Sequence, residues 1–199
     1  AVAAGRKHVR VLLPPVDVHS NAPGAADAAS FRARFGLDET HRNVVIVSRL
    51  AVWLKSESLL RAVDAIRIAG RDSGLRLIIV GEGEARPQLE ELASEVNLAL
   101  GRPAVVLTGA LVDPRPAYAA ADIVIGMGSS ALRALAFGRP VVVVGEAGFS
   151  EVFSPTTADR FLRHGMYGLG EGSEGGVRLP QQLLALIRDR HALGCLGQF

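Results

Sequence analysis

The 199-residue chain has a single cysteine, Cys195. One cysteine forms neither an internal disulfide nor a multi-thiolate metal site, which favours a reducing, cytoplasmic setting. No apolar run approaches the roughly 20 residues that a membrane-spanning helix needs. The first residues, AVAAGRKHVRV, lack the basic-then-apolar pattern of a signal peptide. The five histidines lack the spacing of metal ligands, so we expect no metal site.

An excess of charge of one sign is also missing. The 22 basic and 20 acidic residues give a net charge of only +2, which disfavours nucleic acid as a partner. Lysine itself is scarce, because 20 of the 22 basic residues are arginine and only Lys7 and Lys55 are lysine. Hydrophobic residues make up 49% of the chain, enough for one domain with its own core.

Short runs rich in Val and Ile alternate with helical patterns through the middle of the chain. Strands are predicted at 43–48, 75–80, 104–107, 122–125 and 140–144, and helices at 55–70, 84–96, 114–120 and 130–137. Continuously apolar strands joined by helices form parallel sheets covered on both faces, and their crossovers are right-handed. The pattern therefore predicts an α/β fold with a doubly wound, Rossmann-like parallel sheet flanked by helices.

The two ends depart from this pattern. Residues 14–30 carry three prolines and no regular period, which predicts an irregular connector. Glycine and polar residues dominate 145–179, where no further strand is predicted. Short helices are predicted at 29–36, 156–164 and 180–190. We therefore divide the chain into a linker-like segment over 1–30 and a domain over 31–199.

The first candidate site combines Arg49, at the end of the first predicted strand, with Lys55, six residues later at the start of the next helix. A guanidinium fork and an ammonium point charge over one loop suit a diphosphate. The alternative is that Arg49 pairs with a nearby carboxylate such as Glu57 while Lys55 is simply solvated, as loop charges often are.

The second candidate is the turn Gly126-Met127-Gly128-Ser129-Ser130, between a predicted strand and a predicted helix. Glycines let the backbone turn its N–H groups inward, a serine can cap the helix, and the helix dipole favours an anion there. The turn therefore predicts a phosphate cradle. The alternative is an ordinary tight turn with a serine cap.

A third candidate is the acidic loop from Gly145 to Glu151, whose carboxylates either accept hydrogen bonds from sugar hydroxyls or are solvated. The segment Gly81-Glu82-Gly83 has only half of a dinucleotide fingerprint, so we expect no NAD site and no cofactor. No Ser/His/Asp set is recognisable. Trp53 is expected to lie exposed beside the Arg49 loop, where it either shields the site or merely packs.

Taken in order, these motifs resemble the carboxy-terminal, nucleotide-sugar-binding domain of the retaining group 1 glycosyltransferases, which have the GT-B fold. The resemblance covers nearly the whole chain. It is carried by Val11–Asp17, Arg34–Leu37, Val47–Leu50 with Lys55, Ile79–Gly83, Leu107–Gly109, Tyr118–Ile123 and Ala134–Val142.

The resemblance implies one half of a GT-B fold, whose substrate is a nucleoside diphosphate sugar. Arg49 and Lys55 would be the catalytic residues, stabilising the leaving diphosphate without a metal. The loop after Leu107 would face the nucleobase through its backbone, and the turn after Ile125 would lie near the diphosphate and sugar. The donor-binding residues implied are Gly109, Ala110, Leu111, Gly126, Gly128, Ser129, Ser130 and Arg133.

The chain departs from the family pattern at Ile125 and Arg133, where the family usually carries two glutamates. A carboxylate accepts both ribose hydroxyls, whereas a guanidinium only donates, so neither glutamate role carries over. Arg133 therefore either meets a phosphate or is paired elsewhere. Ser48 and Ser56 stand where the family favours glycine.

A complete enzyme of this kind needs about twice this length, because its acceptor domain is itself a domain of ordinary size. We therefore expect a donor-binding fragment that is inactive without an amino-terminal acceptor domain, through which any peripheral membrane contact would be made. The alternative, motivated by the missing glutamates, is a non-catalytic nucleotide-sugar-binding or regulatory module. An epimerase-like GT-B relative is a weaker option.

Overall fold

The computed structural model describes residues 15–171 and 176–189. Residues 1–14 of the expected linker, and Cys195, lie outside the described residues. Six strands form one sheet in the order β3-β2-β1-β4-β5-β6. The strands are β1 (Arg42–Val47), β2 (Leu75–Val80), β3 (Val105–Gly109), β4 (Ile123–Gly126), β5 (Val141–Val144) and β6 (Ser150–Val152).

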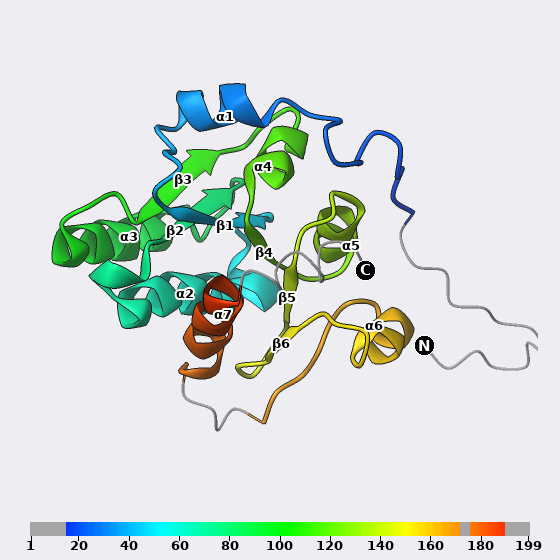
Figure 1. Ribbon diagram of the computed structural model, residues 1–199. Helices are drawn as coiled ribbons and strands as arrows, with labels where there is room; N and C mark the ends of the chain where they lie inside the picture. Colours follow the sequence, from blue (N-terminus) through cyan, green and yellow to red (C-terminus); the bar gives the residue numbers. More distant parts are fainter. Residues whose placement is uncertain (1–14, 172–175, 190–199) are drawn as a thin grey trace, which may run out of the picture.

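Helices cover both faces of the sheet (Figure 1). One face carries α2 (Val52–Ala69), α3 (Arg86–Leu100) and α7 (Arg178–Arg188). The other carries α1 (Ala28–Arg34), α4 (Arg115–Ala120), α5 (Ser129–Ala136) and α6 (Ala158–His164). A short 3-10 turn, η1 (Arg71–Ser73), precedes β2. No helix in the described ranges has both the length and the apolar character to cross a membrane.

Alternation along the central strands explains why both faces are covered. Val44 and Ile46 pack into the core beneath α2 and α3, while Val45 between them packs into the core beneath α4 and α5. Successive side chains of a strand point to opposite faces, so a run of apolar residues needs a helical layer on each side. The predicted α/β fold with a doubly wound sheet is therefore confirmed.

The predicted parallel sheet carries one further strand that was not predicted. β6 pairs antiparallel with β5, inside the segment expected to hold no strand. Its three residues, Ser150–Val152, are too few to show a hydrophobic period. The helix expected from residue 55 also begins earlier, at Val52, so Lys55 lies within the first turn of α2.

The chain reverses its direction across the sheet between β1 and β4. Strands β1, β2 and β3 follow one another toward one edge, whereas β4 pairs with the other side of β1 and β5 lies beyond it. Because β1 and β4 are parallel neighbours, the loops that follow them lie at the same end of the sheet, next to each other. At such a switch point the two loops leave a crevice outside the carboxyl ends of the strands.

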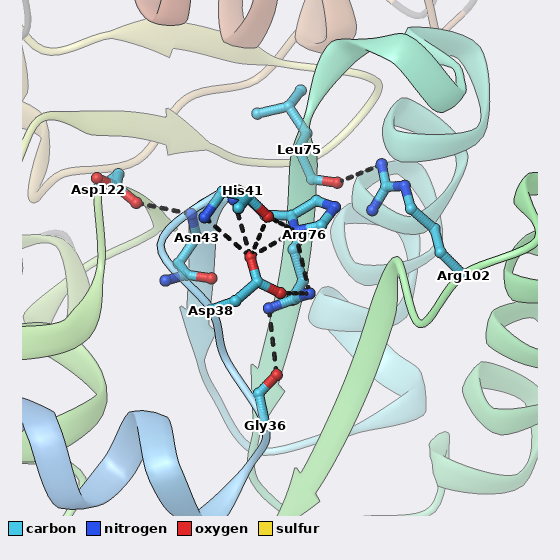
Figure 2. Close-up of polar contacts among 9 residues, drawn as sticks. Gly36, Asp38, His41, Asn43, Leu75, Arg76, Arg102 and Asp122 are labelled. Atoms are coloured by element: carbon cyan, nitrogen blue, oxygen red, sulfur yellow. Dashed lines mark hydrogen bonds and ion pairs between the residues drawn. The ribbon is translucent and has the colours of Figure 1, made fainter.

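The amino ends of the strands, opposite these loops, hold a polar cluster around two buried residues, Asn43 and Arg76 (Figure 2). Arg76 of β2 is 3% exposed, and its Nη2 donates to Asp38 Oδ2 at 2.7 Å. Asp122 Oδ2 accepts from the backbone N–H of Asn43 at 2.7 Å. Nη2 of Arg102 donates to the Leu75 carbonyl at 2.8 Å. These bonds tie the beginnings of β1 and β2 to the loops around them.

Candidate functional site

The two cations that the sequence singled out lie on one loop and the helix that follows it. Arg49 comes after β1 and is exposed, with no ion pair among the described residues. Lys55 lies in the first turn of α2 and is partly buried. Burial, and then the charge of Arg49, lower the pKa of Lys55. The two like charges are therefore close enough to repel, which is the arrangement that a bound anion would relieve.

Close backbone packing fixes the path of this loop. Leu50 is fully buried, and its N–H donates to the Glu82 carbonyl at 2.9 Å. A Cβ on Gly81 would lie 1.8 Å from the Ser48 carbonyl oxygen, and one on Gly83 would lie 2.4 Å from that of Leu50. These two glycines therefore make room for the Arg49 loop and do not form a dinucleotide turn.

The turn between β4 and α5 lies next to this loop. Gly128 has φ +58°, occupies the N-cap position, and donates its N–H to the Met166 carbonyl at 2.9 Å. The expected serine cap was wrong, because no side chain caps α5. Ser129 is exposed, whereas the Ser130 hydroxyl is buried beside the Tyr118 phenol without a hydrogen bond of normal geometry. A Cβ on Gly126 would lie 2.8 Å from that hydroxyl oxygen.

Lys55 and Ser130 line the same small cavity, together with Ser48, Gly126 and Met127. Its volume of about 20 Å³ accommodates a group the size of one water or one phosphate oxygen. A larger ligand would place one polar group in the cavity and extend over the exposed rim beside Arg49. The structure thus brings the first two candidate sites together.

The remaining predicted residues lie toward β3. Gly109 ends that strand, and its carbonyl accepts from the Gly81 N–H at 3.0 Å. Ala110 is exposed and Leu111 is half-buried. None of the three lines the cavity of Lys55.

Arg133 lies on α5 on the side that faces this β3 loop. Its positive charge is among the causes that lower the pKa of Asp113, after the hydrogen bonds from Arg115 and the charge of Arg115. The Arg133 Nε is buried and has no hydrogen-bond partner among the described residues. The Arg133 charge is therefore close to Asp113, in the loop that was expected to face a nucleobase.

A glutamate of α2 binds the acidic loop after β5 and holds it in position. The Glu57 carboxylate accepts from the N–H groups of Ala147 at 3.1 Å and Gly148 at 2.8 Å, and from Arg61 Nε at 2.9 Å. The alternative pairing of Arg49 with Glu57 is therefore not observed. The sequence pattern missed this role of Glu57 because a helical carboxylate gives no sign of which loop will fold back onto it.

Trp53 follows the Arg49 loop and is 86% exposed. Within residues 15–171 and 176–189, no group of three His, Cys, Asp or Glu side chains lies close enough to hold a metal ion. The polar side chains that line the cavity are those of Lys55, Ser48, Ser58 and Ser130, an ammonium and hydroxyls, which suit an anion.

The comparisons with known proteins concern the family and the fold of the chain. Residues 41–165, more than half of the chain, match the family of group 1 glycosyl transferases. The chain is 33% identical over 159 residues to the D-inositol 3-phosphate glycosyltransferase of Rhodococcus jostii, covering 73% of this chain and 34% of that protein. The chain spans about a third of the length of the curated relatives it matches.

Solved structures share the fold. The Anabaena protein Alr3699/HepE in complex with UDP superposes with a TM-score of 0.65 at 22% identity, covering 92% of this chain and 48% of that one. The C-terminal domain of LpcC, a group 1 family glycosyl transferase from Francisella tularensis, gives a TM-score of 0.65 at 18% identity, covering 92% and 93%. The α/β fold thus matches GT-B glycosyltransferase neighbours over about half of their length. By its sequence match, this chain belongs to the group 1 glycosyl transferases.

Proposed function

We propose that this chain is the donor-binding, carboxy-terminal domain of a glycosyltransferase and that it binds a nucleoside diphosphate sugar. The single observation that carries the proposal is the convergence of Lys55, Arg49 and Ser130 at the switch point of the sheet. Two points from the comparisons support it. One structural neighbour was solved with UDP, and another, of nearly the same extent, is a C-terminal domain.

In this proposal the diphosphate lies over the rim of the cavity. Lys55 and the Ser130 hydroxyl would contact one phosphate, and the Arg49 guanidinium would donate two parallel hydrogen bonds to the other. As the bond between the sugar and the diphosphate breaks, negative charge grows on the leaving oxygen. Two fixed cations stabilise that charge more strongly than they stabilise the neutral glycosidic oxygen, which lowers the barrier.

The nucleobase would lie against the backbone of Gly109, Ala110 and Leu111, with Arg133 beside the ribose or a phosphate. At Gly126, Gly128 and Ser129 the backbone would lie close to the diphosphate. Transfer with retention at the sugar carbon is part of the proposal and rests on the resemblance to the family. An acceptor domain from outside these 199 residues would complete the active site.

Calorimetry with UDP, GDP, ADP and CDP tests the proposal. We expect one of them to bind, and we expect Lys55→Ala and Arg49→Ala each to weaken binding by about 1–3 kcal/mol, the range for charge-assisted hydrogen bonds. Lys7→Ala removes the other lysine and serves as the matched control. Unchanged binding in the Arg49→Ala, Lys55→Ala double variant would reject the assignment.

A second candidate is a nucleotide-sugar-binding module without catalysis. Ile125 and Arg133 favour it, because neither supplies a carboxylate at the cavity. The two functions differ in one measurement on the full-length protein. Release of nucleoside diphosphate from the bound nucleotide sugar in the presence of acceptor supports the enzyme, whereas binding without release supports the module.

A further inference from the structure

The loop after β5 carries Glu146 in a rigid setting. The N–H of Glu146 donates to the Gly168 carbonyl at 3.1 Å, and its carbonyl accepts from the Gly170 N–H at 2.9 Å. Ala147, the next residue, has φ +50°, an unfavourable conformation for a residue with a Cβ. The Ala147 and Gly148 N–H groups donate to the Glu57 carboxylate, and these two hydrogen bonds stabilise that conformation.

Tyr167 lies between this loop and the turn at the start of α5. The carbonyl of Met166, on one side of it, accepts from Gly128, and the carbonyl of Gly168, on the other, accepts from Glu146. Burial, followed by hydrogen bonding to Glu146, raises the pKa of Tyr167 to about 12. At neutral pH the phenol therefore keeps its proton, and it is the donor toward the Glu146 carboxylate.

The order of the strands indicates which part of a bound nucleotide sugar would lie at the loop after β5. From one edge of the sheet, the loops follow in the order β3, β2, β1, β4 and β5. A nucleoside diphosphate sugar has its diphosphate in the middle, with the nucleoside at one end and the sugar at the other. If the diphosphate lies between β1 and β4 and the base lies at β3, the sugar extends toward the loop after β5.

Few carboxylates at this edge of the sheet are free to meet sugar hydroxyls. Glu82 is paired with Arg86, and Asp113 is paired with Arg115. Glu57 is occupied by loop N–H groups and Arg61, as described above. Glu146 forms no ion pair among the described residues, and the turn after β4 contains no carboxylate at all.

We propose that Glu146 accepts hydrogen bonds from hydroxyl groups of the donor sugar, with Tyr167 orienting its carboxylate and Glu57 positioning its loop. This inference rests on the proposed function. Glu146 would make the contact with the sugar, and Tyr167 and Glu57 are positioning residues that act through it. The ligand class is a hexose or similar sugar with adjacent hydroxyls, because a carboxylate accepts two such bonds at once.

The test compares two ligands on each variant by calorimetry: a nucleoside diphosphate, and the same nucleotide carrying a sugar, each taken from a panel of UDP, GDP and ADP forms. For Glu146→Gln we expect the Kd of the nucleotide sugar to rise about 10- to 100-fold, the range for hydrogen bonds to a charged group. The Kd of the nucleoside diphosphate should stay within about twofold. Tyr167→Phe should raise the ratio of the two Kd values by less than Glu146→Gln does.

The control is Glu84→Gln, which neutralises the exposed, unpaired glutamate of the loop after β2 and should change neither Kd. Equal effects of Glu146→Gln on both ligands, or no effect on either, would overturn the inference. So would a chain that binds a nucleoside diphosphate but none of the nucleotide sugars. Failure to bind any nucleoside diphosphate would overturn the proposed function, and this inference with it.

Discussion

Removing the Asp38 carboxylate should destabilise the fold far more than its position in an exposed loop suggests. The Arg76 side chain is 4% exposed and forms its one ion pair within the described chain with Asp38. Its other partners there are His41 Nδ1 at 3.2 Å and the Gly36 carbonyl at 3.5 Å, and its Nε has none. Asp38→Ala would therefore leave a buried guanidinium without a carboxylate to balance its charge.

The magnitude follows from the burial of the two partners. Breaking a buried ion pair costs about 3–5 kcal/mol. The Asp38 side chain is 44% exposed, so water screens part of the ion pair. In Asp38→Ala, water can also enter the space that the carboxylate leaves and solvate the Arg76 guanidinium. We therefore expect a loss at the low end, about 3 kcal/mol of unfolding free energy. Asp38→Ala, Arg76→Met should recover part of it, because an apolar side chain replaces the stranded charge.

The dependence on pH gives an independent check. Hydrogen bonds from Thr40 and then Arg76 hold the pKa of Asp38 far below its usual range. A carboxyl whose pKa is lower when folded contributes its stability above its unfolded pKa, about 4, and loses it as the pH falls toward the folded value. The difference between wild type and Asp38→Ala should therefore shrink steadily below about pH 4.

Urea unfolding followed by far-UV circular dichroism measures both effects. Glu39→Gln is the matched control, since Glu39 is the exposed neighbouring carboxylate without an ion pair among the described residues, and it should change stability by less than about 0.5 kcal/mol. A loss below 1 kcal/mol in Asp38→Ala, or a difference that persists at low pH, would refute the reasoning.

Three further predictions concern the site itself. Gly81→Ala should cost about 3 kcal/mol, because its Cβ would overlap the Ser48 carbonyl, whereas Gly165→Ala, with open space around it, should cost about 1 kcal/mol in denaturant unfolding. Glu57→Gln should speed hydrogen exchange at the Ala147 and Gly148 amides, and unchanged exchange would contradict the loop contact. Ser130→Ala should weaken nucleoside diphosphate binding in calorimetry by about 1 kcal/mol without lowering stability, since it removes a buried hydroxyl that lacks a normal hydrogen bond.

The central part of the fold was accessible from sequence because its signal is local and strong. Strand β2 was predicted over 75–80 and is observed there, since all of its residues except Arg76 are Leu, Ile or Val. Strand β6 was missed because three residues cannot show a period. Its pairing with β5 depends on how the intervening loop folds back, which no local pattern encodes.

The same distinction applies to the site. The approach of Lys55 to Arg49 follows from a strand that ends where a helix begins, so spacing alone predicted it. Tyr167 gave no signal, because it stands in a glycine-rich segment and is held at the sheet edge by backbone bonds that its neighbours Met166 and Gly168 accept from Gly128 and Glu146. The alternative that Arg49 pairs with Glu57 is not observed, because the Glu57 carboxylate binds its helical neighbour Arg61 and two loop amides.

The scarcity of lysine permits a direct test of the central claim, that Lys55 meets the donor diphosphate. Dimethylation with ¹³C-formaldehyde labels Lys7, Lys55 and the amino terminus, and a Lys7→Arg variant assigns the signals. In the free chain, the NMR titration midpoint of Lys55 should lie below the ordinary value for a lysine, because burial and Arg49 lower its pKa. A saturating nucleoside diphosphate should raise the Lys55 midpoint and leave that of Lys7 unchanged. A Lys55 midpoint that does not move while the nucleotide binds would contradict the account.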